Sequence, residues 1–287
     1  MKFSIILCTV DRTTVIVDFL ESLLKQSYKN FELIVVDQNL SDDLLEIIRK
    51  FEKHMCIKYI HSSRGLSRSR NVGMLHASGD ILCFPDDDCT YPSELLENIN
   101  VIFMYDYGID FLLGKTIDSH TGKIIAGKNI INSMYVKCNY FGGSSTNLFI
   151  NIKFEHVHAF SFDERFGIGA TFHAEEENDL IIRMLKNGKK GVYIPKKNYV
   201  YHPDKDSNYY DLKRASKRGY GFGALVAKHI YSICGMNYFF RYFLIRVPAS
   251  ILVSIIIGNF SKSRFNSVKY MSMWKGFYFY ISQSNKT

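Results

Sequence analysis

Three consecutive carboxylates, Asp86, Asp87 and Asp88, follow the apolar run at residues 81–84 after a single proline. Carboxylates crowded at the end of a buried strand repel one another unless a cation compensates their charge. Mg²⁺ and Mn²⁺ take oxygen ligands and typically bridge one or two carboxylates to the phosphates of a substrate. The triplet therefore indicates a divalent metal that holds a phosphorylated ligand. The alternative is a solvated acidic turn ahead of a helix.

A second acidic group, Glu175, Glu176 and Glu177, precedes a segment whose apolar residues recur at helical spacing. A carboxylate held near other carboxylates has its pKa raised towards the range in which it can take a proton from a hydroxyl. Acids at the start of a helix also stabilise the helix dipole, so simple capping is the alternative. The group is thus a candidate for acid–base chemistry.

The chain around the first acidic group alternates strands and helices. Short apolar runs predict strands at residues 3–9, 31–36, 57–60 and 81–84, and helical periodicity predicts helices at residues 15–24, 41–51, 66–77 and 94–103. This order is typical of an α/β domain with a Rossmann-like, mainly parallel sheet and flanking helices. Ligands of such sheets bind beyond the carboxyl ends of the strands. Since Asp11, Asp37 and the triplet each follow a strand, we expect one site at that edge.

Four motifs in this order resemble those of glycosyltransferase family 2, whose members have a GT-A fold. They are Thr9-Val10-Asp11-Arg12, residues 20–37 ending on Asp37, residues 64–73 with the pair Arg70-Asn71, and residues 84–88. The resemblance extends over residues 3–203. It implies an enzyme that transfers a sugar from a nucleotide-diphosphate donor with inversion, with Mn²⁺ or Mg²⁺ as the cofactor.

The resemblance also implies roles for individual residues. Thr9 and Asp11 would line the nucleoside pocket, and Asp37 would accept a hydrogen bond from the base, because the imide N–H of a pyrimidine needs an acceptor. Arg70 would lie near the pyrophosphate, which needs cationic neighbours. The expected nucleotide-binding set is Thr9, Asp11, Arg12, Asp37, Arg70, Asp86 and Asp87, and the expected metal set is Asp86, Asp88 and His202. A lone histidine such as His202 is more often structural, which is the alternative for that residue.

The general base is expected from a later motif. Aligning Asp179-Leu180-x-x-Arg183 with the family places Glu176 and Glu177 over a Glu-Asp pair whose second member is the base. Glu177 is therefore the expected base, and Glu176 the alternative. Glu in place of Asp adds one methylene, so the backbone must lie further from the acceptor. The residues expected to meet the sugar or the acceptor are Gly143, Ser144, His173 and Asp179, in and beyond the loop that begins at Gly142.

These observations predict an inverting, metal-dependent glycosyltransferase with a nucleotide-sugar donor, and UDP is favoured over other nucleotides. The expected acceptor is a hydroxyl of a glycan, lipid-linked, in bacterial surface polysaccharide assembly. A nucleotidyltransferase shares strand-end carboxylates, but no glycine-rich loop with a lysine follows the first strand. A catalytically silent carbohydrate-binding protein on the same fold is the third alternative. No motif beyond charge and aromatic residues supports a nucleic-acid partner.

The rear of the chain differs in composition from the front. Residues 1–182 carry 17 Lys and Arg against 25 Asp and Glu, whereas residues 183–287 carry 19 against 3. We therefore expect a catalytic domain at residues 1–203 and a basic, aromatic-rich helical region at residues 204–287 that binds an anionic membrane surface. A buried helical subdomain or a homodimer interface is the alternative. The longest charge-free run, residues 247–261, has 15 residues, which is short of the roughly 20 that span a bilayer.

The expected location is the cytoplasm, peripheral on the inner face of the cell membrane. The run at residues 3–8 reaches Asp11 without a small-residue cleavage site, so a strand is expected there instead of a signal peptide. The 6 cysteines show no CxxC spacing, and the sequence therefore predicts neither a zinc site nor a disulfide framework.

Overall fold

The computed structural model describes residues 1–106, 108–127, 132–137, 143–153, 155–204 and 210–284. The chain forms two compact units. The first comprises Met1–Phe162 and Arg183–Asp204, and the second comprises Asp163–Ile182 and Lys205–Thr287. The sequence placed residues 163–182 in the catalytic domain, but this segment packs with the C-terminal helices. Composition could not reveal that, because the segment is acidic like the front of the chain.

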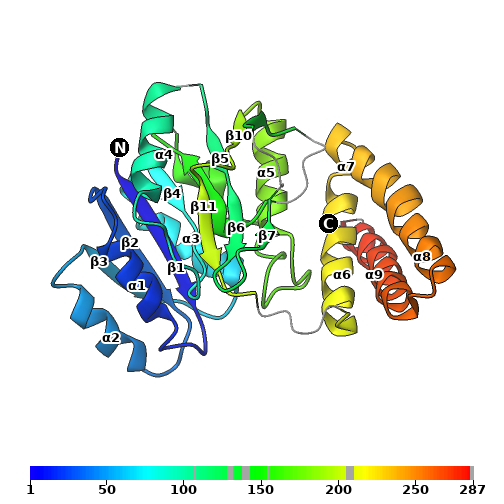
Figure 1. Cartoon of the computed structure of the whole chain (residues 1–287), viewed down its shortest axis with the longest axis horizontal. Helices are drawn as coiled ribbons and strands as arrows, with labels where there is room; N and C mark the ends of the chain where they lie inside the picture. The colour runs from blue at the N-terminus through cyan, green and yellow to red at the C-terminus, as the bar shows by residue number, and fades with distance from the viewer. Residues whose placement is uncertain (107, 128–131, 138–142, 154, 205–209, 285–287) are drawn as a thin grey trace. The chain divides into compact units, whose positions relative to one another are not determined.

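The first unit contains the predicted sheet, and its α/β, mainly parallel character is confirmed (Figure 1). Its strand order is β3-β2-β1-β4-β9-β5-β10-β8. The first four of these strands are mutually parallel, whereas β9 runs antiparallel to both of its neighbours. The strands are β1 (Phe3–Thr9), β2 (Phe31–Asp37), β3 (Ile57–His61), β4 (Ile81–Cys83), β5 (Phe111–Leu113), β8 (Met134–Tyr135), β9 (Leu148–Asn151) and β10 (Gly191–Tyr193).

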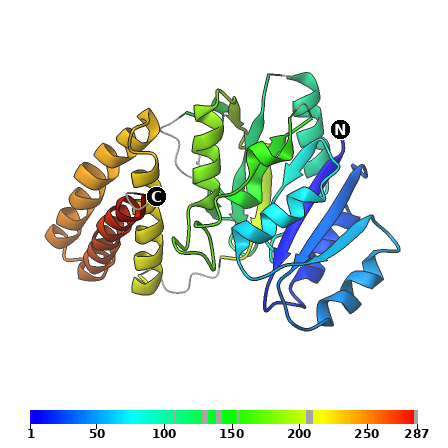
Figure 2. The ribbon, with the colours of Figure 1, turned by 180° about the vertical axis from the view of Figure 1, so that it is seen from behind.

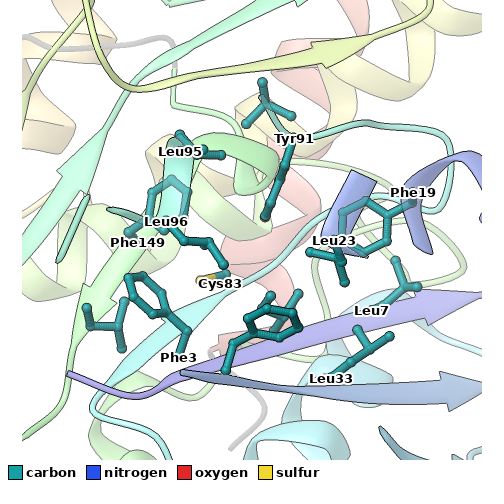
Figure 3. Close-up of a cluster of buried hydrophobic side chains, with 14 of the residues drawn as sticks. Phe3, Leu7, Phe19, Leu23, Leu33, Cys83, Tyr91, Leu95, Leu96 and Phe149 are labelled. Carbon is teal, nitrogen blue, oxygen red and sulfur yellow. The ribbon is translucent and has the colours of Figure 1, made fainter. Parts of the chain in front are cut away.

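Helices cover both faces of this sheet (Figures 1 and 2). On one face, side chains of β1 and β2 such as Leu7 and Leu33 pack against Phe19, Leu23 and Leu95 in a fully buried core (Figure 3). The opposite face meets the third helix. The helices of this unit are α1 (Ile16–Leu24), α2 (Asp43–Phe51), α3 (Leu66–Leu75) and α4 (Leu95–Tyr105), with short 3-10 turns at Ser145–Asn147 and Val157–Phe160.

Gly73 lets α3 approach that opposite face closely. A Cβ atom at Gly73 would lie 2.5 Å from Ile6 Cγ2 and 3.0 Å from Val36 Cγ2. Because the first of these distances is too short for real carbon atoms, a larger residue would push the helix off the sheet. This explains why a glycine follows the Arg70-Asn71 pair by two residues.

A three-stranded sheet completes the first unit and carries His202. It has the order β11-β6-β7, with β6 (Lys115–Asp118), β7 (Ile124–Ala126) and β11 (Tyr199–His202). Two backbone hydrogen bonds join Thr90 and Tyr201, at 2.9 and 3.0 Å. They fix the end of β11 beside the segment that follows Asp88.

The second unit is helical, as expected for the rear of the chain. Its helices are α6 (Leu212–Lys228), α7 (Ile233–Tyr238), a π-helix (Phe239–Arg246), α8 (Val247–Ile256) and α9 (Phe260–Ser284), and α5 (Glu176–Lys186) begins in it. Glycines allow the backbones of α6 and α9 to come into direct contact where the two helices cross. At Gly223, for example, a Cβ atom would lie 1.9 Å from the backbone oxygen of Met273, which leaves no room for a side chain. Aromatic rings fill the space beside this crossing, namely Phe222, Phe239, Phe243, Trp274 and Phe277.

The residues of α7, the π-helix and α8 run on as one helical stretch, Ile233–Ile256. By length and composition alone, this helix of 24 residues could cross a membrane. The most apolar segment of the helix has a mean hydropathy of 1.7, and only 17% of that segment is buried. The charge-free run of 15 residues is shorter than the apolar helix, because the helix includes Arg241 and Arg246. Most of its apolar side chains are exposed, whereas Tyr238, Phe243 and Val247 are buried.

The cysteines depart from the expectation at one position. Cys8, Cys56, Cys83 and Cys89 are free thiols. Cys234, however, is disulfide-bonded. The linear spacing of cysteines carries no information on such a pairing, because residues far apart in sequence can meet in the fold.

Candidate active site

Asp86, Asp88 and His202 form a cluster with the composition of a metal site. One ligand atom from each lies within 4.8 Å of the others. The Nε2 atom of His202 is 3.0 Å from Asp88 Oδ1 and 3.8 Å from Asp86 Oδ2. The acids follow β4, and the histidine ends β11. Two oxygen ligands and an imidazole nitrogen suit a divalent ion of the Mn²⁺ or Mg²⁺ type.

Burial makes this cluster favourable for a cation. It raises the pKa of Asp86, and the positive charges of Arg70 and His202 only partly offset that effect. The hydrogen bond with Asp88 raises the pKa of His202 in turn. Carboxylates that are costly to ionise in a buried place gain most from a divalent charge beside them. These residues therefore fit the metal that the sequence predicted.

Arg12 pairs with two carboxylates of the acidic triplet. The Arg12 Nη1 atom donates to Asp87 Oδ1 at 2.9 Å and to Asp88 Oδ2 at 3.0 Å. Asp87 Oδ2 also accepts a hydrogen bond from Thr9 Oγ1 at 2.7 Å. The hydrogen bond between Thr9 and Asp87 thus connects the end of β1 to the acidic triplet. Arg12 neutralises part of the negative charge of the triplet.

Asp37 is fully buried, and two residues that the sequence analysis missed enclose it. Asn39 donates to Asp37 Oδ1 from its backbone nitrogen at 2.8 Å and from Nδ2 at 2.7 Å. The hydroxyl of Tyr59 donates to Asp37 Oδ2. Tyr59 and Asn39 therefore lie against the two oxygens of the buried carboxylate. Only the pairing of β2 with β3 brings Tyr59 here, so no sequence motif identified it.

Asp11 lies beside this group on strained backbone. Its φ is +55°, in the left-handed region that residues with a Cβ seldom adopt. Its backbone nitrogen donates to Asn39 Oδ1 at 2.6 Å, and its carboxylate pairs with Arg64 Nη2 at 2.7 Å. Strain of this kind is common where a loop shapes a binding site.

Arg70 is buried, with 1% of its surface exposed. Its Nη2 atom donates to Ser145 Oγ at 2.7 Å and lies 3.5 Å from Asp86 Oδ1, and its guanidinium lies over the ring of Phe162 at 5.3 Å. Arg70 therefore contacts the metal cluster through Asp86. Ser144 bonds Thr146 Oγ1 at 2.9 Å, next to Gly143, while Gly142 lies outside the described residues.

The acids of the later motif belong to the second unit. Glu176 is buried, and burial raises the pKa of Glu175 to about 7 against the opposing effects of Lys269 and Asn178. Glu175 was not among the expected site residues, and its only signal in the sequence was its place in a run of three glutamates. His173 is exposed, with φ at +52°.

Asp179 lies where an acceptor would not reach it. It is 0% exposed, and its Oδ1 atom is 2.6 Å from Lys228 Nζ and 2.8 Å from His229 Nε2. The expected contact with a sugar or acceptor therefore does not fit this arrangement. The helical pattern alone could not reveal this, because Lys228 and His229 follow Asp179 by about 50 residues.

The fold and the Asp-Asp-His cluster define the class of this protein, a GT-A-type nucleotide-binding fold with a candidate metal site at the strand ends. Residues 4–123 match the family model of glycosyl transferase family 2. This part of the chain belongs to glycosyltransferase family 2.

Among curated proteins, the chain is 31% identical over 140 residues to the poly(ribitol-phosphate) beta-N-acetylglucosaminyltransferase TarS of Staphylococcus aureus (strain Mu50), covering 47% of this chain and 23% of TarS. It is 33% identical over 103 residues to the putative glycosyltransferase EpsE of Bacillus subtilis (strain 168), covering 34% of this chain and 37% of EpsE. The matches thus span well under half the length of these relatives.

Solved structures support the fold over nearly the whole chain. The crystal structure of S. aureus TarS 1-349 superposes with a TM-score of 0.60 at 18% identity, covering 96% of this chain and 92% of that one. The mannosyltransferase PcManGT of Pyrobaculum calidifontis, in complex with GDP-Man and Mn²⁺, gives 0.64 at 12% identity, covering 96% and 87%. At such identities the likeness establishes the GT-A fold alone.

Proposed function

We propose that this protein is an inverting, metal-dependent glycosyltransferase that moves a sugar from a UDP-sugar to a hydroxyl of a lipid-linked glycan in bacterial surface polysaccharide assembly. The observation that carries the proposal is the cluster of Asp86, Asp88 and His202 at the strand ends of a family 2 domain. Two neighbours of the same fold support a nucleotide-sugar donor: TarS 1-349 was crystallised with UDP-GlcNAc, and PcManGT with GDP-Man and Mn²⁺.

The proposed reaction is a direct displacement. The acceptor oxygen attacks the anomeric carbon of the donor, its proton passes to the Glu177 carboxylate, and the bond from that carbon to the diphosphate breaks with inversion. A divalent ion held by Asp86, Asp88 and His202 would stabilise the charge on the leaving diphosphate. Buried Arg70 holds Asp86 in place through its charge. Tyr59, Asn39 and Asp37 would receive the base.

Ligand binding tests the first half of this proposal. We expect UDP with Mn²⁺ to raise the melting temperature and GDP to raise it less, because a ligand of the native state stabilises it in proportion to affinity. At a ligand concentration of 100 times Kd the gain is about 2.7 kcal/mol, or roughly 5 to 10 °C. A thermal-shift series with UDP, GDP, Mn²⁺, Mg²⁺ and EDTA measures this. A shift of equal size with EDTA present would contradict metal-mediated binding.

Product analysis separates the alternatives. Incubating the protein with a panel of nucleotide sugars and Mn²⁺ should release a nucleoside diphosphate from one of them. Formation of pyrophosphate from a nucleoside triphosphate and a sugar phosphate would instead identify a nucleotidyltransferase. Binding without any turnover, with or without an acceptor, would identify a catalytically silent carbohydrate-binding protein.

The helical unit supports the proposed location on the cytoplasmic face of the cell membrane. The helix Ile233–Ile256 exposes nine large apolar side chains, here called the apolar ridge. They are Ile233, Met236, Phe240, Leu244, Ile245, Leu252, Val253, Ile255 and Ile256. Exposed basic residues of the same unit, which suit anionic lipid headgroups at about 1 kcal/mol each, are Lys213, Lys217, Arg218, Lys262, Arg264 and Lys275.

Two arginines favour a helix that lies on the membrane over one that crosses it. Arg241 and Arg246 stand near the middle of this helix and are exposed. An arginine at the centre of a membrane costs at least about 2.5 to 3.5 kcal/mol. In the interfacial position the apolar ridge would enter the acyl region and both arginines would reach the headgroups.

Vesicle flotation tests the membrane proposal. We expect the protein to float with vesicles that contain phosphatidylglycerol, to bind pure phosphatidylcholine vesicles weakly, and to be partly released by high salt. The double variant Phe240→Glu/Leu244→Glu should abolish flotation. Leu40→Glu, a matched change of a fully exposed leucine in the first unit, should not. Flotation of the double variant equal to the wild type would contradict the proposal, and a concentration-dependent dimer that this variant disrupts would favour a homodimer interface.

A further inference from the structure

The segment that leads into α5 has an unusually strained backbone. Within nine residues, Gly167, Gly169, His173 and Glu175 all have positive φ, at 101°, 84°, 52° and 77°. The last two carry a Cβ atom, for which this conformation is unfavourable. Such conformations persist where surrounding contacts determine them. The segment therefore depends on contacts from elsewhere in the second unit.

One set of contacts is a buried ion cluster. Lys228 Nζ, near the end of α6, lies 2.7 Å from Asp163 Oδ2 and 2.6 Å from Asp179 Oδ1, and His229 Nε2 lies 2.8 Å from the same Asp179 oxygen. Arg165 also pairs with Asp163, at 2.7 Å. The two carboxylates are thus balanced by Lys228 and Arg165. We call Asp163, Asp179, Lys228 and His229 the anchor cluster.

The tautomer of His229 fits this arrangement. Its Nδ1 atom is buried and has no hydrogen-bond partner among the described residues. The N–H that Nε2 donates to the Asp179 carboxylate satisfies this side of the ring. The hydrogen bonds from Arg165 and Lys228 lower the pKa of Asp163 in spite of its burial, so the carboxylate is ionised and the pair with Lys228 is formed at neutral pH.

A second set of contacts is aromatic and steric. The ring of Phe172 is 2% exposed and lies 5.8, 6.1 and 5.7 Å from the rings of Tyr220, Phe279 and Tyr280. Gly221 of α6 passes directly beneath the segment, because a Cβ there would lie 2.4 Å from the Phe172 oxygen. Helices α6 and α9 thus hold the strained segment at its centre, while the anchor cluster holds it at both ends.

We propose that the anchor cluster is a positioning device that fixes the start of α5 on the helical unit and so orients the Glu177 carboxylate. Asp179 follows Glu177 by two residues, and residues two apart on a helix point to nearly opposite sides. The contacts of Asp179 with Lys228 and His229 place the side of the helix that carries Asp179 against α6. Glu177 therefore lies on the opposite side of the helix. The proposal rests on the proposed function only where Glu177 acts as the base.

The test combines hydrogen exchange with steady-state kinetics on the full chain. Asp179→Asn should increase amide exchange in peptides from residues 163–178, lower kcat at least about tenfold, and leave the KM of the donor and its thermal shift unchanged. In a Glu177→Gln background the same change should cause no further loss, since residues that act as a unit are non-additive. Lys186→Gln, an exposed change on α5, should match the wild type in every measurement.

Conservative variants separate positioning from general stability. Lys228→Gln should lose protection of the amides of residues 163–178 from exchange and should lose turnover. Lys228→Arg, which keeps the positive charge, should retain most of both. If Asp179→Asn does not fold, the Lys228 pair gives the same comparison, because Lys228 is 15% exposed and tolerates a polar replacement more readily. Unchanged exchange at residues 163–178, or a kcat loss that adds fully to that of Glu177→Gln, would overturn the proposal. If the wild type transfers no sugar, the proposed function fails, and the exchange data still decide whether the cluster holds this segment.

Discussion

Replacing Asp88 by asparagine should reduce sugar transfer by on the order of 100- to 1,000-fold, because a metal at a leaving diphosphate contributes several kcal/mol and each 1.36 kcal/mol is tenfold in rate. Asp88 is buried and lies 3.0 Å from His202 Nε2, so its carboxylate would be the central oxygen ligand of the proposed metal site. The amide keeps the shape of the side chain but loses the charge. Transfer kinetics across a Mn²⁺ titration measure both the rate loss and the weaker metal binding.

The control for this variant is Asp18→Asn, an equivalent change at an exposed position on α1. It should retain wild-type activity and Mn²⁺ dependence. The melting temperature of Asp88→Asn should stay close to that of the wild type, because Arg12 keeps its bond to Asp87. An Asp88→Asn protein that keeps most of its Mn²⁺-stimulated transfer would show that Asp88 is not a metal ligand.

Glu177→Gln should lower kcat by about 100- to 10,000-fold, the usual contribution of a positioned general base. Donor affinity should not change, since the proposed donor site belongs to the first unit and Glu177 to the second. The glutamine cannot accept the acceptor proton, although it fills the same volume. Single-turnover transfer, together with UDP binding by calorimetry, measures the two quantities separately.

Glu176→Gln and Glu175→Gln are the matched variants for this experiment. Both remove one carboxylate from the same turn, so both should perturb the local charge without removing the base. The raised pKa of Glu175, about 7, makes it the strongest competitor for the role. Full turnover in Glu177→Gln, with either of the other two inactive, would move the base to that residue.

The sequence by itself determined the first half of the fold and the family. The predicted strands at residues 3–9, 31–36, 57–60 and 81–84 correspond to β1 to β4, because short apolar runs of this length are typical of buried strands. The acidic triplet could be placed at the sheet edge for the same reason, since the carboxyl ends of parallel strands meet there. His202 was found only through its likeness to the family, and its distance from Asp88 needed the structure.

Tertiary structure alone decided the partners of these residues. Tyr59 reaches Asp37 because β3 pairs with β2, and Arg70 reaches Asp86 and Ser145 from a helix on the far face of the sheet. These contacts join residues that are 16 to 75 positions apart. No local pattern encodes them, because they follow from the pairing of β3 with β2 and from the packing of α3 against β1 and β2.

The structure likewise decided which unit holds the segment 163–182 and what Asp179 does there. Composition and helical spacing report on a segment's own burial and periodicity, and by both measures this segment resembles the catalytic domain. Its packing on α6 depends on Gly221, Lys228 and His229, which lie about 50 residues later. The sequence thus determined which acids the segment carries, and the long-range contacts of the fold decided that Asp179 is enclosed by Lys228 and His229.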